Sequence, residues 1–321
     1  MGSFAVMRIL ITGAAGNLGS RLAQHLLLGL HQLRLLVHHR ELPFAVSAYP
    51  NVEVCRVDLG KPETLATVCR EVDCIVHFAG VLFAPNPENF LPKTNVGYVQ
   101  NLSAAGLAAH VGKFILISFP HVEGETFPDR PAQARLDCHP PSVHAQTRLA
   151  AEKHLFAVCA GTSTTPVALR AGMIYGPGIL MIEAARWLLR HRLLAVWREP
   201  TWEHLLSLPD FLTATTAAIE GRNIRGIYNV ADDQPVTLQE FLDAIAQHWG
   251  YPRPLRCPKW TFYAAAACCE TVASVFNTQS PLTRDFIRIG MVSSVANTER
   301  MKKELLPTLA YPTLKEGLAL L

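Results

Sequence analysis

The sequence predicts an α/β protein that is built on a doubly wound parallel sheet and ends in a smaller C-terminal region. Three observations support this class. The 321 residues are 50% hydrophobic and only 17% charged, which supplies enough apolar side chains for a packed core. Short apolar runs alternate with amphipathic stretches from Arg8 onward, as they do where helices cover both faces of a parallel sheet. A glycine-rich turn, residues 13–19, directly follows the first apolar run.

The first half of the chain contains the predicted strands and helices of one domain, residues 1–178. Its strands are short and apolar throughout, which is typical of strands that are buried on both faces. The predicted strands are Arg8–Thr12, Leu33–His38, Val52–Val57, Cys74–Phe78, Phe114–Ser118 and Pro166–Arg170. The predicted helices are Leu18–Leu28, Pro62–Glu71, Lys93–His110 and Ser142–Ala160.

The regular alternation fades after Gly178, and residues 179–321 are predicted to form mostly a substrate-binding region. A strand is expected at Gly226–Val230, so that residues of about 203–232 return to the core of the first domain. The apolar segment Phe262–Phe276 is shorter than the roughly 20 residues of a membrane span. It therefore leaves a peripheral membrane contact open but predicts no transmembrane segment.

Composition and charge exclude several function classes. The formal net charge of +3 is small and the basic residues are scattered, so nucleic acid is not an expected partner. The eight cysteines form no C-x-x-C pair and have no histidines at zinc spacing. No metal site is therefore expected, and the cysteines are interpreted as buried thiols in a reducing compartment. The first residues lack the pattern of a secretion signal, which predicts a cytoplasmic location.

A G-x-x-G-x-x-G run opens a helix directly after the first predicted strand. Its glycines allow a tight turn and a close approach to a pyrophosphate, whose charge meets free N–H groups at the positive end of the helix dipole. This order of strand, loop and helix predicts a Rossmann-type dinucleotide-binding domain. The residues expected to cradle the phosphates are Gly13, Ala15, Gly16, Asn17, Leu18 and Gly19.

The end of the second predicted strand bears on the choice of nucleotide. A carboxylate at this point would bind the ribose 2′-hydroxyl of NAD, whereas cations would meet the 2′-phosphate of NADP. The strand ends in His38, His39 and Arg40 without an acid, which favours NADP(H), with NAD as the alternative. Asp58 and Leu59 would lie near the adenine, although Asp58 would serve equally well as a loop cap.

Further segments along the chain carry a family resemblance. They are the glycine loop 13–19, Asp58-Leu59, Val76–Gly80, Asn95-Val96, the strand that ends at Ser118, Arg170–Gly178 and Gly226–Val230. In these segments the chain resembles the extended short-chain dehydrogenase/reductase family, also called the NAD-dependent epimerase/dehydratase family. The resemblance covers nearly the whole chain. Pro281–Thr283 and Tyr311-Pro312 are more similar to the 3β-hydroxysteroid-dehydrogenase-like branch of the family.

The resemblance implies further contacts and partners. Proteins of this family bind a small-molecule substrate beside the nicotinamide, and they frequently form homodimers through two surface helices. Tyr175 and Gly178 would lie in a loop that borders the nicotinamide. The further residues that the resemblance assigns to the nucleotide are Phe78, Ala79, Gly80, Asn95, Arg148, Ala171 and Met173.

The chain departs from the family where the chemistry is expected. Members carry a Ser or Thr after about the fifth strand and a Tyr-x-x-x-Lys pair on the next helix. Here His144 replaces the tyrosine, Arg148 replaces the lysine, and Phe119 follows Ser118 at the usual hydroxyl position. Residues 144 and 148 project from one helix face, and like-charge repulsion from Arg148 is expected to keep His144 neutral. The candidate catalytic residues are His144, Arg148 and Ser118.

Three functional hypotheses follow. In the first, the protein is an NADP(H)-dependent oxidoreductase for a small, apolar or carrier-linked carbonyl or hydroxyl compound, and His144 replaces the phenol as acid and base. In the second, the nucleotide stays bound while His144, with His121 or Asp137, catalyses an isomerisation, elimination or cyclisation. In the third, the site is inert and the protein is an NADP-sensing or scaffold module. The structural alternative is an ordinary helix face on which Arg148 pairs with Glu152.

The substrate side offers two features, each with a structural alternative. Several aromatic residues would line an apolar pocket or, as is more common, belong to the core: Trp187, Trp197, Trp202, Phe211, Trp260 and Phe262. A basic cluster would hold an anionic substrate or, as is more common, form a solvated helix face: Arg186, Arg190, His191 and Arg192.

Overall fold

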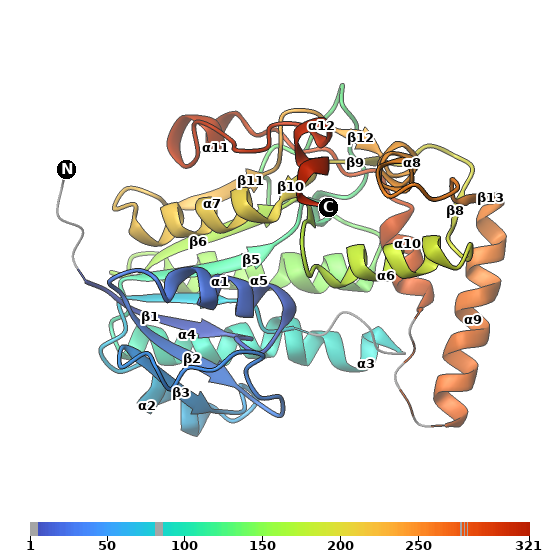
Figure 1. The fold of residues 1–321 in the computed structure, drawn as a ribbon. Helices are drawn as coiled ribbons and strands as arrows, with labels where there is room; N and C mark the ends of the chain where they lie inside the picture. Colours follow the sequence, from blue (N-terminus) through green and yellow to red (C-terminus); the bar gives the residue numbers. More distant parts are fainter. Residues whose placement is uncertain (1–5, 81–85, 277, 279, 281) are drawn as a thin grey trace.

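Seven parallel strands form the central sheet of the protein (Figure 1). The computed structural model describes residues 6–80, 86–276, 278, 280 and 282–321. The strand order is β11-β6-β5-β4-β1-β2-β3, and every neighbouring pair is parallel. The chain winds outward from β1 to β3 and then crosses back to start again with β4 on the other side of β1. This order confirms the predicted doubly wound α/β fold.

The strands of the first half lie within one residue of their predicted bounds. They are β1 (Arg8–Thr12), β2 (Gln32–Val37), β3 (Val52–Arg56), β4 (Cys74–His77), β5 (Lys113–Ser118) and β6 (Thr165–Ala171). Ile9 and Ile11 pack into the hydrophobic cluster on one face of the sheet, and Leu10 packs into the cluster on the other face. Both faces are covered, which explains why the inner strands of the sheet are mostly apolar.

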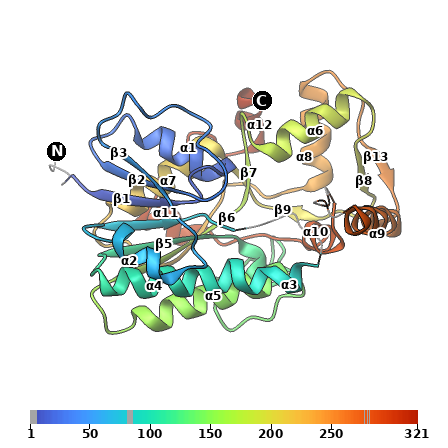
Figure 2. The same ribbon diagram turned by 90° about the horizontal axis from the view of Figure 1, so that it is seen from below.

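Helices cover the sheet on both sides, as Figure 2 shows. One side carries α1 (Asn17–Leu26) and α7 (Leu208–Glu220), and the other carries α2 (Leu65–Val68), α4 (Tyr98–Ala108) and α5 (Val143–Cys159). The predicted helix Lys93–His110 begins earlier in the structure. It starts as α3 (Pro87–Leu91) and passes through a π-helical turn at Pro92–Gly97, because a proline lacks the N–H that a regular helix would use there.

A smaller region gathers at the end of the sheet where the strands finish (Figure 1). Thr237 is the N-cap of one of its helices and forms a capping box with Glu240. Its main elements are α6 (Leu180–Arg190), β8 (Ala195–Trp197), α8 (Leu238–His248), β13 (Leu255–Cys257), α9 (Lys259–Val275) and α10 (Arg284–Gly290). The strand β11 (Gly226–Val230) instead joins the central sheet beside β6.

Three short pairings complete the strand pattern, and only the first of them connects the two parts of the chain. In the first, β7 (Met173–Tyr175) runs parallel to β10 (Leu205–Ser207). In the second, β9 (Trp202–Glu203) pairs with β12 (Val236–Thr237), and in the third β13 pairs with β8. The chain ends in α11 (Glu299–Glu304) and the single turn α12 (Leu314–Gly317), which is shorter than the expected last helix.

Three expectations need comment. The eight cysteines are all free, but Cys268 is exposed on α9, so the interpretation of all eight as buried thiols is wrong. Trp187 and Trp260 are exposed and belong neither to the core nor to a pocket. Pro281 lies outside the described residues. Within the described part of the chain, no helix is long and apolar enough to cross a membrane.

Candidate nucleotide-binding and active site

The glycine loop between β1 and α1 has the geometry that a phosphate-binding turn needs. Gly13 has a φ of +67°, and a Cβ there would lie 3.0 Å from the backbone nitrogen of Ala79. A Cβ on Gly19 would lie 2.3 Å from the carbonyl oxygen of Gly13. Gly16 is the N-cap of α1 and provides no side-chain acceptor. The N–H groups of the first turn therefore stay free for an anionic ligand.

Thr12 fixes the loop to the end of β4. Its Oγ1 accepts hydrogen bonds from the N–H groups of Phe78 and Ala79 at 3.2 and 3.3 Å. The same oxygen lies 2.9 Å from Nδ1 of His77. Thr12 was not among the predicted site residues, although its place directly before Gly13 was a usable signal. Thr12 joins the ends of β1 and β4, the two strands between which the chain changes its winding direction.

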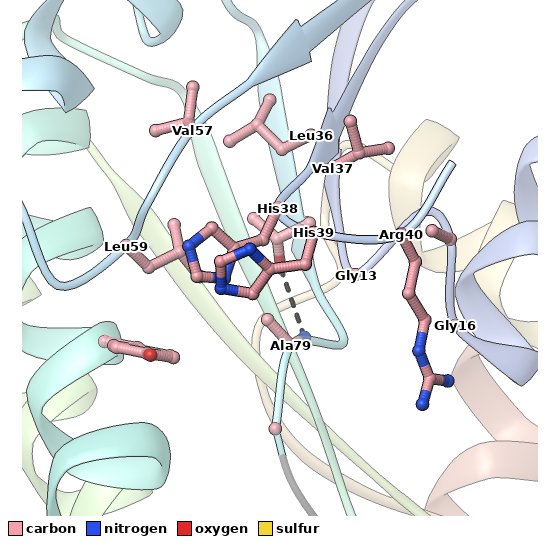
Figure 3. Close-up of a pocket in the computed structure, with 14 residues that line it drawn as sticks. Gly13, Gly16, Leu36, Val37, His38, His39, Arg40, Val57, Leu59 and Ala79 are labelled. Atoms are coloured by element: carbon pink, nitrogen blue, oxygen red, sulfur yellow. Dashed lines mark hydrogen bonds between the residues drawn. The ribbon is translucent and has the colours of Figure 1, made fainter. Parts of the chain in front are cut away.

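A cavity of about 470 Å³ opens at this junction (Figure 3). Nine of the predicted nucleotide residues line it: Gly13, Ala15, Gly16, His38, His39, Arg40, Leu59, Ala79 and Gly80. Five lining residues were missed: Thr12, Leu36, Val37, Val57 and Tyr98. Four of these five are strand or strand-end residues whose side chains look like ordinary core residues in the sequence. Tyr98 begins α4 and reaches the cavity only because α4 packs beside it.

The basic end of β2 forms one wall of the cavity. The rings of His38 and His39 lie 3.6 Å apart between their centroids. Figure 3 shows both imidazoles between Leu59 and Ala79, while the side chain of Arg40 extends on the side of the Gly16 turn. All three basic side chains are exposed to solvent at the cavity rim, and no acid is among the residues that line it.

Several predicted residues support the cavity without lining it. Asn17 donates from Nδ2 to the carbonyl oxygen of Gly178 at 2.8 Å and accepts from the N–H of Leu180 at 3.1 Å, so it ties the loop to the start of α6. Asp58 accepts from the N–H of Gly60 and lies 3.9 Å from Nε2 of His38. The other predicted residues outside the lining are Leu18, Gly19, Phe78, Asn95, Arg148, Ala171 and Met173, and their roles stay predictions.

Buried polar atoms without partners gather beside Gly80. A Cβ on Gly80 would lie 3.1 Å from Nη2 of Arg148 and 3.3 Å from Oδ1 of Asn95. Among the residues that the structure describes, that oxygen, Nε2 of His77, and Nε and Nη1 of Arg148 have no hydrogen-bond partner. Nδ2 of Asn95 is held by Thr147 at 2.9 Å, so the free oxygen has a fixed direction. Unpaired buried groups cost about 1–3 kcal/mol each, which indicates a place for a polar ligand.

His144 lies on the first turn of α5, close to this group. Its side chain is buried, and its ring stacks on Phe119 with 5.1 Å between centroids. Burial lowers the pKa of His144 to about 3, and repulsion from Arg148 and His121 adds to the effect. The expected neutral imidazole is confirmed, but burial rather than Arg148 is its main cause. Burial also lowers the pKa of Arg148 to about 10.

The start of α5 is held from two directions. Oγ of Ser142 accepts a hydrogen bond from the N–H of Ala145. Asp285, 142 residues later in α10, accepts from the N–H of Val143 at 3.3 Å. Carboxylates and hydroxyls at this position satisfy free N–H groups of a helix N-terminus. The smaller region thus helps to place His144.

Ser118 does not face His144 in the structure. Its hydroxyl donates to Oε1 of Glu152, in a buried network. Arg170 lies between two carboxylates, at 2.6 Å from Glu152 and 2.6 Å from Glu123, and all three side chains are at most 1% exposed. The alternative that Arg148 pairs with Glu152 is therefore wrong, because Glu152 is bound to Arg170. This network was not expected from the sequence, since its members lie on four separate segments.

His121 is the second imidazole near the candidate active site. It lies in the turn after β5, with its ring centroid 5.4 Å from that of Phe119. Neither ring nitrogen has a hydrogen-bond partner in the described part of the chain. Burial lowers the pKa of His121 to about 4, so the ring is neutral at pH 7. Within the described ranges, no three His, Cys, Asp or Glu side chains gather as a metal site.

The chain is similar to two groups of curated proteins. It is 27% identical over 301 residues to a 2-alkyl-3-oxoalkanoate reductase from Stenotrophomonas maltophilia, a match that covers 87% of each chain. It is 24% identical over 263 residues to a 3β-hydroxysteroid dehydrogenase/Δ5→4-isomerase from Mycobacterium tuberculosis, covering 75% of this chain and 70% of that protein.

Solved structures share the fold at low sequence identity. The UDP-glucuronic acid 4-epimerase from Bacillus cereus, solved with NAD, matches with a TM-score of 0.76 and 20% identity over 98% of this chain and 97% of that one. The enzyme WbmG from Bordetella bronchiseptica, also solved with NAD, matches with a TM-score of 0.74 and 19% identity over 99% and 95% of the two chains. The family model for NAD-dependent epimerases and dehydratases matches residues 9–231, and this chain belongs to the NAD-dependent epimerase/dehydratase family.

Proposed function

We propose that the protein is an NADP(H)-dependent oxidoreductase that acts on a small, apolar or carrier-linked carbonyl or hydroxyl compound. The observation that carries the proposal is the set of unpaired buried atoms on His77, Asn95 and Arg148 beside Gly80, next to an open phosphate loop. A nicotinamide dinucleotide fits these residues, because it brings phosphates to the loop and hydroxyl and amide groups to the unpaired atoms.

The rim of the cavity supports NADP over NAD. The 2′-phosphate of NADP carries negative charge that cations attract, whereas NAD-binding sites place a carboxylate at this position. The rim holds His38, His39 and Arg40 at that place. In the proposed complex, Arg40 forms a charge-assisted hydrogen bond with the 2′-phosphate, and the two imidazoles flank it.

His144 is proposed to orient and polarise the substrate oxygen. The bound nicotinamide supplies or receives the hydride. A neutral imidazole carries one N–H, which donates to a carbonyl oxygen and stabilises the negative charge that grows there. A buried neutral imidazole acts in this way in other enzymes, where it replaces a stronger acid. Arg148 would hold the ribose hydroxyls with the N–H groups that lack partners.

The relatives support the substrate class. One is named as a reductase of 2-alkyl-3-oxoalkanoates and another as a dehydrogenase of 3β-hydroxysteroids. Both names describe a carbonyl or hydroxyl group on a largely apolar molecule. We therefore propose an apolar substrate for this chain, with cytoplasmic location and a homodimer as further parts of the proposal that follow from the family resemblance.

Nucleotide titration tests the proposal first. The purified protein should bind NADPH more tightly than NADH, because only NADPH has the phosphate that Arg40 meets. Arg40→Ala should weaken the binding of NADPH about tenfold, which is about 1.4 kcal/mol, and leave the binding of NADH unchanged. Arg222→Ala is the matched control, since it lies at the opposite end of the sheet between α7 and β11. Tighter binding of NADH would contradict the NADP assignment, and no affinity for either nucleotide would remove the whole proposal.

A second candidate is an NADP-sensing protein without turnover. It is favoured by Phe119, which occupies the usual hydroxyl position and stacks on His144, and by Ser118, whose hydroxyl is committed to Glu152. Oxidation of one NADPH per product formed would support the oxidoreductase, and product without net NADPH loss would support an isomerase. Tight binding without turnover of any 3-oxoacyl or ketosteroid compound would support the sensor.

A further inference from the structure

The exposed apolar side chains of the protein are unevenly distributed. Among the described residues, thirteen large apolar side chains are exposed, and nine of them belong to the smaller region. These nine are Leu180, Met181, Trp187, Leu193, Leu255, Trp260, Val272, Val275 and Phe276. A concentration of this kind marks a surface that is covered in use, because single scattered residues are the norm elsewhere.

Four of these nine side chains lie on α9 or at its C-terminal end, and a stripe of exposed residues runs along this helix. Trp260, Ala264, Cys268, Val272 and Phe276 recur at four-residue intervals, and all five are exposed. Each step of four residues turns the row by about 40°, so it winds across the exposed half of the helix from Trp260 to Phe276, and 17 helical residues extend for about 25 Å. The opposite side of α9 packs inward through the buried residues Ala266 and Ala273.

The stripe carries no acid. Glu270 is the one acidic residue of α9, and its carboxylate is mostly buried and paired with Arg284 of α10. Trp260 and Phe276 mark the two ends of the stripe, and each is about 70% exposed, at 69% and 71%. Aromatic rings at such positions are typical of surfaces that lie in a membrane interface.

A basic edge continues the stripe at the start of α9. β13 runs beside β8 and ends two residues before α9, and the N–H of Leu255 donates to the carbonyl oxygen of Leu194. Leu255 is therefore paired with Ala195, and exposed Leu193 lies in the chain that leads into this edge. Figure 2 shows β8, β13 and α9 together at the outer edge, far from β2 and β3. We call the α9 stripe together with residues 187–193 and 253–260 the outer face.

Cations predominate on the outer face. Arg190, Arg192, Arg253 and Lys259 are its basic residues near the β8–β13 edge, where Arg253 lies 4.0 Å from Asp243. In the part of the chain that the structure describes, no ion pair is recorded for Arg190, Arg192 or Lys259. Basic residues beside aromatic and aliphatic ones match the negative charge and apolar interior of an anionic lipid surface.

We propose that the outer face binds the surface of an anionic lipid bilayer, with the apolar stripe of α9 in the interface and the basic edge on the lipid headgroups. This contact goes beyond the proposed oxidoreductase function, which concerns the nucleotide cavity. A second copy of the chain fits the face less well. A two-fold dimer would place this face against the same face of the partner, whose residues 187–193 and 253–260 contain no acid to pair with the cations.

Vesicle co-sedimentation of the full chain tests this proposal. The protein should sediment with vesicles of phosphatidylcholine plus phosphatidylserine, and weakly with phosphatidylcholine alone. High salt should reduce the binding, because the cations are solvent-exposed. The double variant Trp260→Ser/Phe276→Ser should lower the binding constant at least tenfold, about 1.4 kcal/mol, since two aromatic side chains no longer leave water. Arg192→Glu/Lys259→Glu should abolish the preference for anionic vesicles.

The control variant changes exposed leucines on another face. Leu28 and Leu30 follow α1 and are 88% and 81% exposed, so Leu28→Ser/Leu30→Ser should leave vesicle binding unchanged. Retained NADPH affinity shows that each variant is folded. Absence of binding to anionic vesicles, or an equal loss in the control, would overturn the proposal. So would a concentration-dependent dimer that Trp260→Ser/Phe276→Ser dissociates, because the face would then be an interface between copies.

Discussion

A neutral imidazole at position 144 can donate one hydrogen bond and accept one. It carries no positive charge at pH 7, so it is not a strong proton donor. Burial lowers the pKa of His144 to about 3, and the ring lies against Phe119. The tyrosine of the family works by giving and taking a proton beside a cation. His144 is therefore suited to hold and polarise a substrate oxygen. Complete transfer of a proton to or from the substrate would have to involve water.

Loss of the imidazole should reduce turnover more than nucleotide binding. We expect His144→Ala to lower kcat at least about 100-fold, the size of effect that a positioned donor or acid–base group contributes, with unchanged Kd for NADPH. His25→Ala, an exposed histidine of α1, is the matched control and should retain full activity. Steady-state kinetics with a 3-oxoacyl ester measure the effect. Unchanged turnover of His144→Ala would show that the residue is not catalytic.

His121 should make stability depend on acidity. Its pKa of about 4 in the folded protein is below the ordinary value of 6.5, so the unfolded chain binds the proton more tightly. Above pH 6.5 the neutral ring contributes its full share to the free energy of unfolding. This contribution is lost as the pH falls towards 4. In His121→Phe this loss disappears, and the fall in unfolding free energy between pH 7 and pH 5 should be smaller by up to about 2 kcal/mol.

Urea unfolding at several pH values measures that difference. His25→Phe provides the control, because this histidine is exposed on α1. Asp232 changes stability in the opposite direction, since burial raises its pKa to about 8, but it is the same in all three proteins and cancels from the comparison. Parallel pH profiles for the wild-type chain and His121→Phe would contradict a neutral buried His121.

At the scale of elements, α5 connects the candidate chemistry to the core. His144, Arg148 and Glu152 follow one another at four-residue intervals and therefore lie along one side of the helix. Glu152 binds Arg170 of β6 and accepts from Ser118 of β5. The buried carboxylate thus holds α5 against both strands, one turn below Arg148.

Breaking this network should destabilise the protein strongly. Glu152→Ala leaves Arg170 with one carboxylate in a fully buried site, and removal of one partner from such a pair costs about 3–5 kcal/mol. Glu152→Gln keeps hydrogen bonds and should cost less. Glu71→Ala, which removes an exposed ion pair with Arg8, should cost much less, because solvent screens exposed ion pairs. Denaturant unfolding measures the loss of unfolding free energy in each of the three variants. Equal losses for Glu152→Ala and Glu71→Ala would show that the network contributes little.

At the scale of the whole molecule, the strand order decides where the cavity lies. The chain winds from β1 towards β3 on one side and from β4 towards β6 on the other, so the loops after β1 and β4 separate and leave a crevice. Gly13 and Ala79 belong to these two loops and come so close that a side chain on Gly13 would collide with Ala79. The smaller region then closes one end, through the bonds of Asn17 to Gly178 and Leu180.

Local patterns in the sequence were sufficient to predict the strands, the glycine loop and the helix that bears His144. Short apolar runs reveal strands that are buried on both faces, and a glycine run after a strand permits few backbone paths, so these features depend on neighbouring residues alone. The family membership was likewise legible in the residues themselves. The basic end of β2 was also legible, since His38, His39 and Arg40 are consecutive.

Contacts between distant segments were decided only by the tertiary structure. The commitment of Ser118 to Glu152, the capping of α5 by Asp285, and the approach of Tyr98 to the cavity join residues that are 34 to 142 positions apart or lie on separate elements. The exposed stripe of α9 is a further case, because its sequence is as apolar as that of a core helix. Burial depends on which elements pack together, and that packing is a property of the whole chain rather than of any segment.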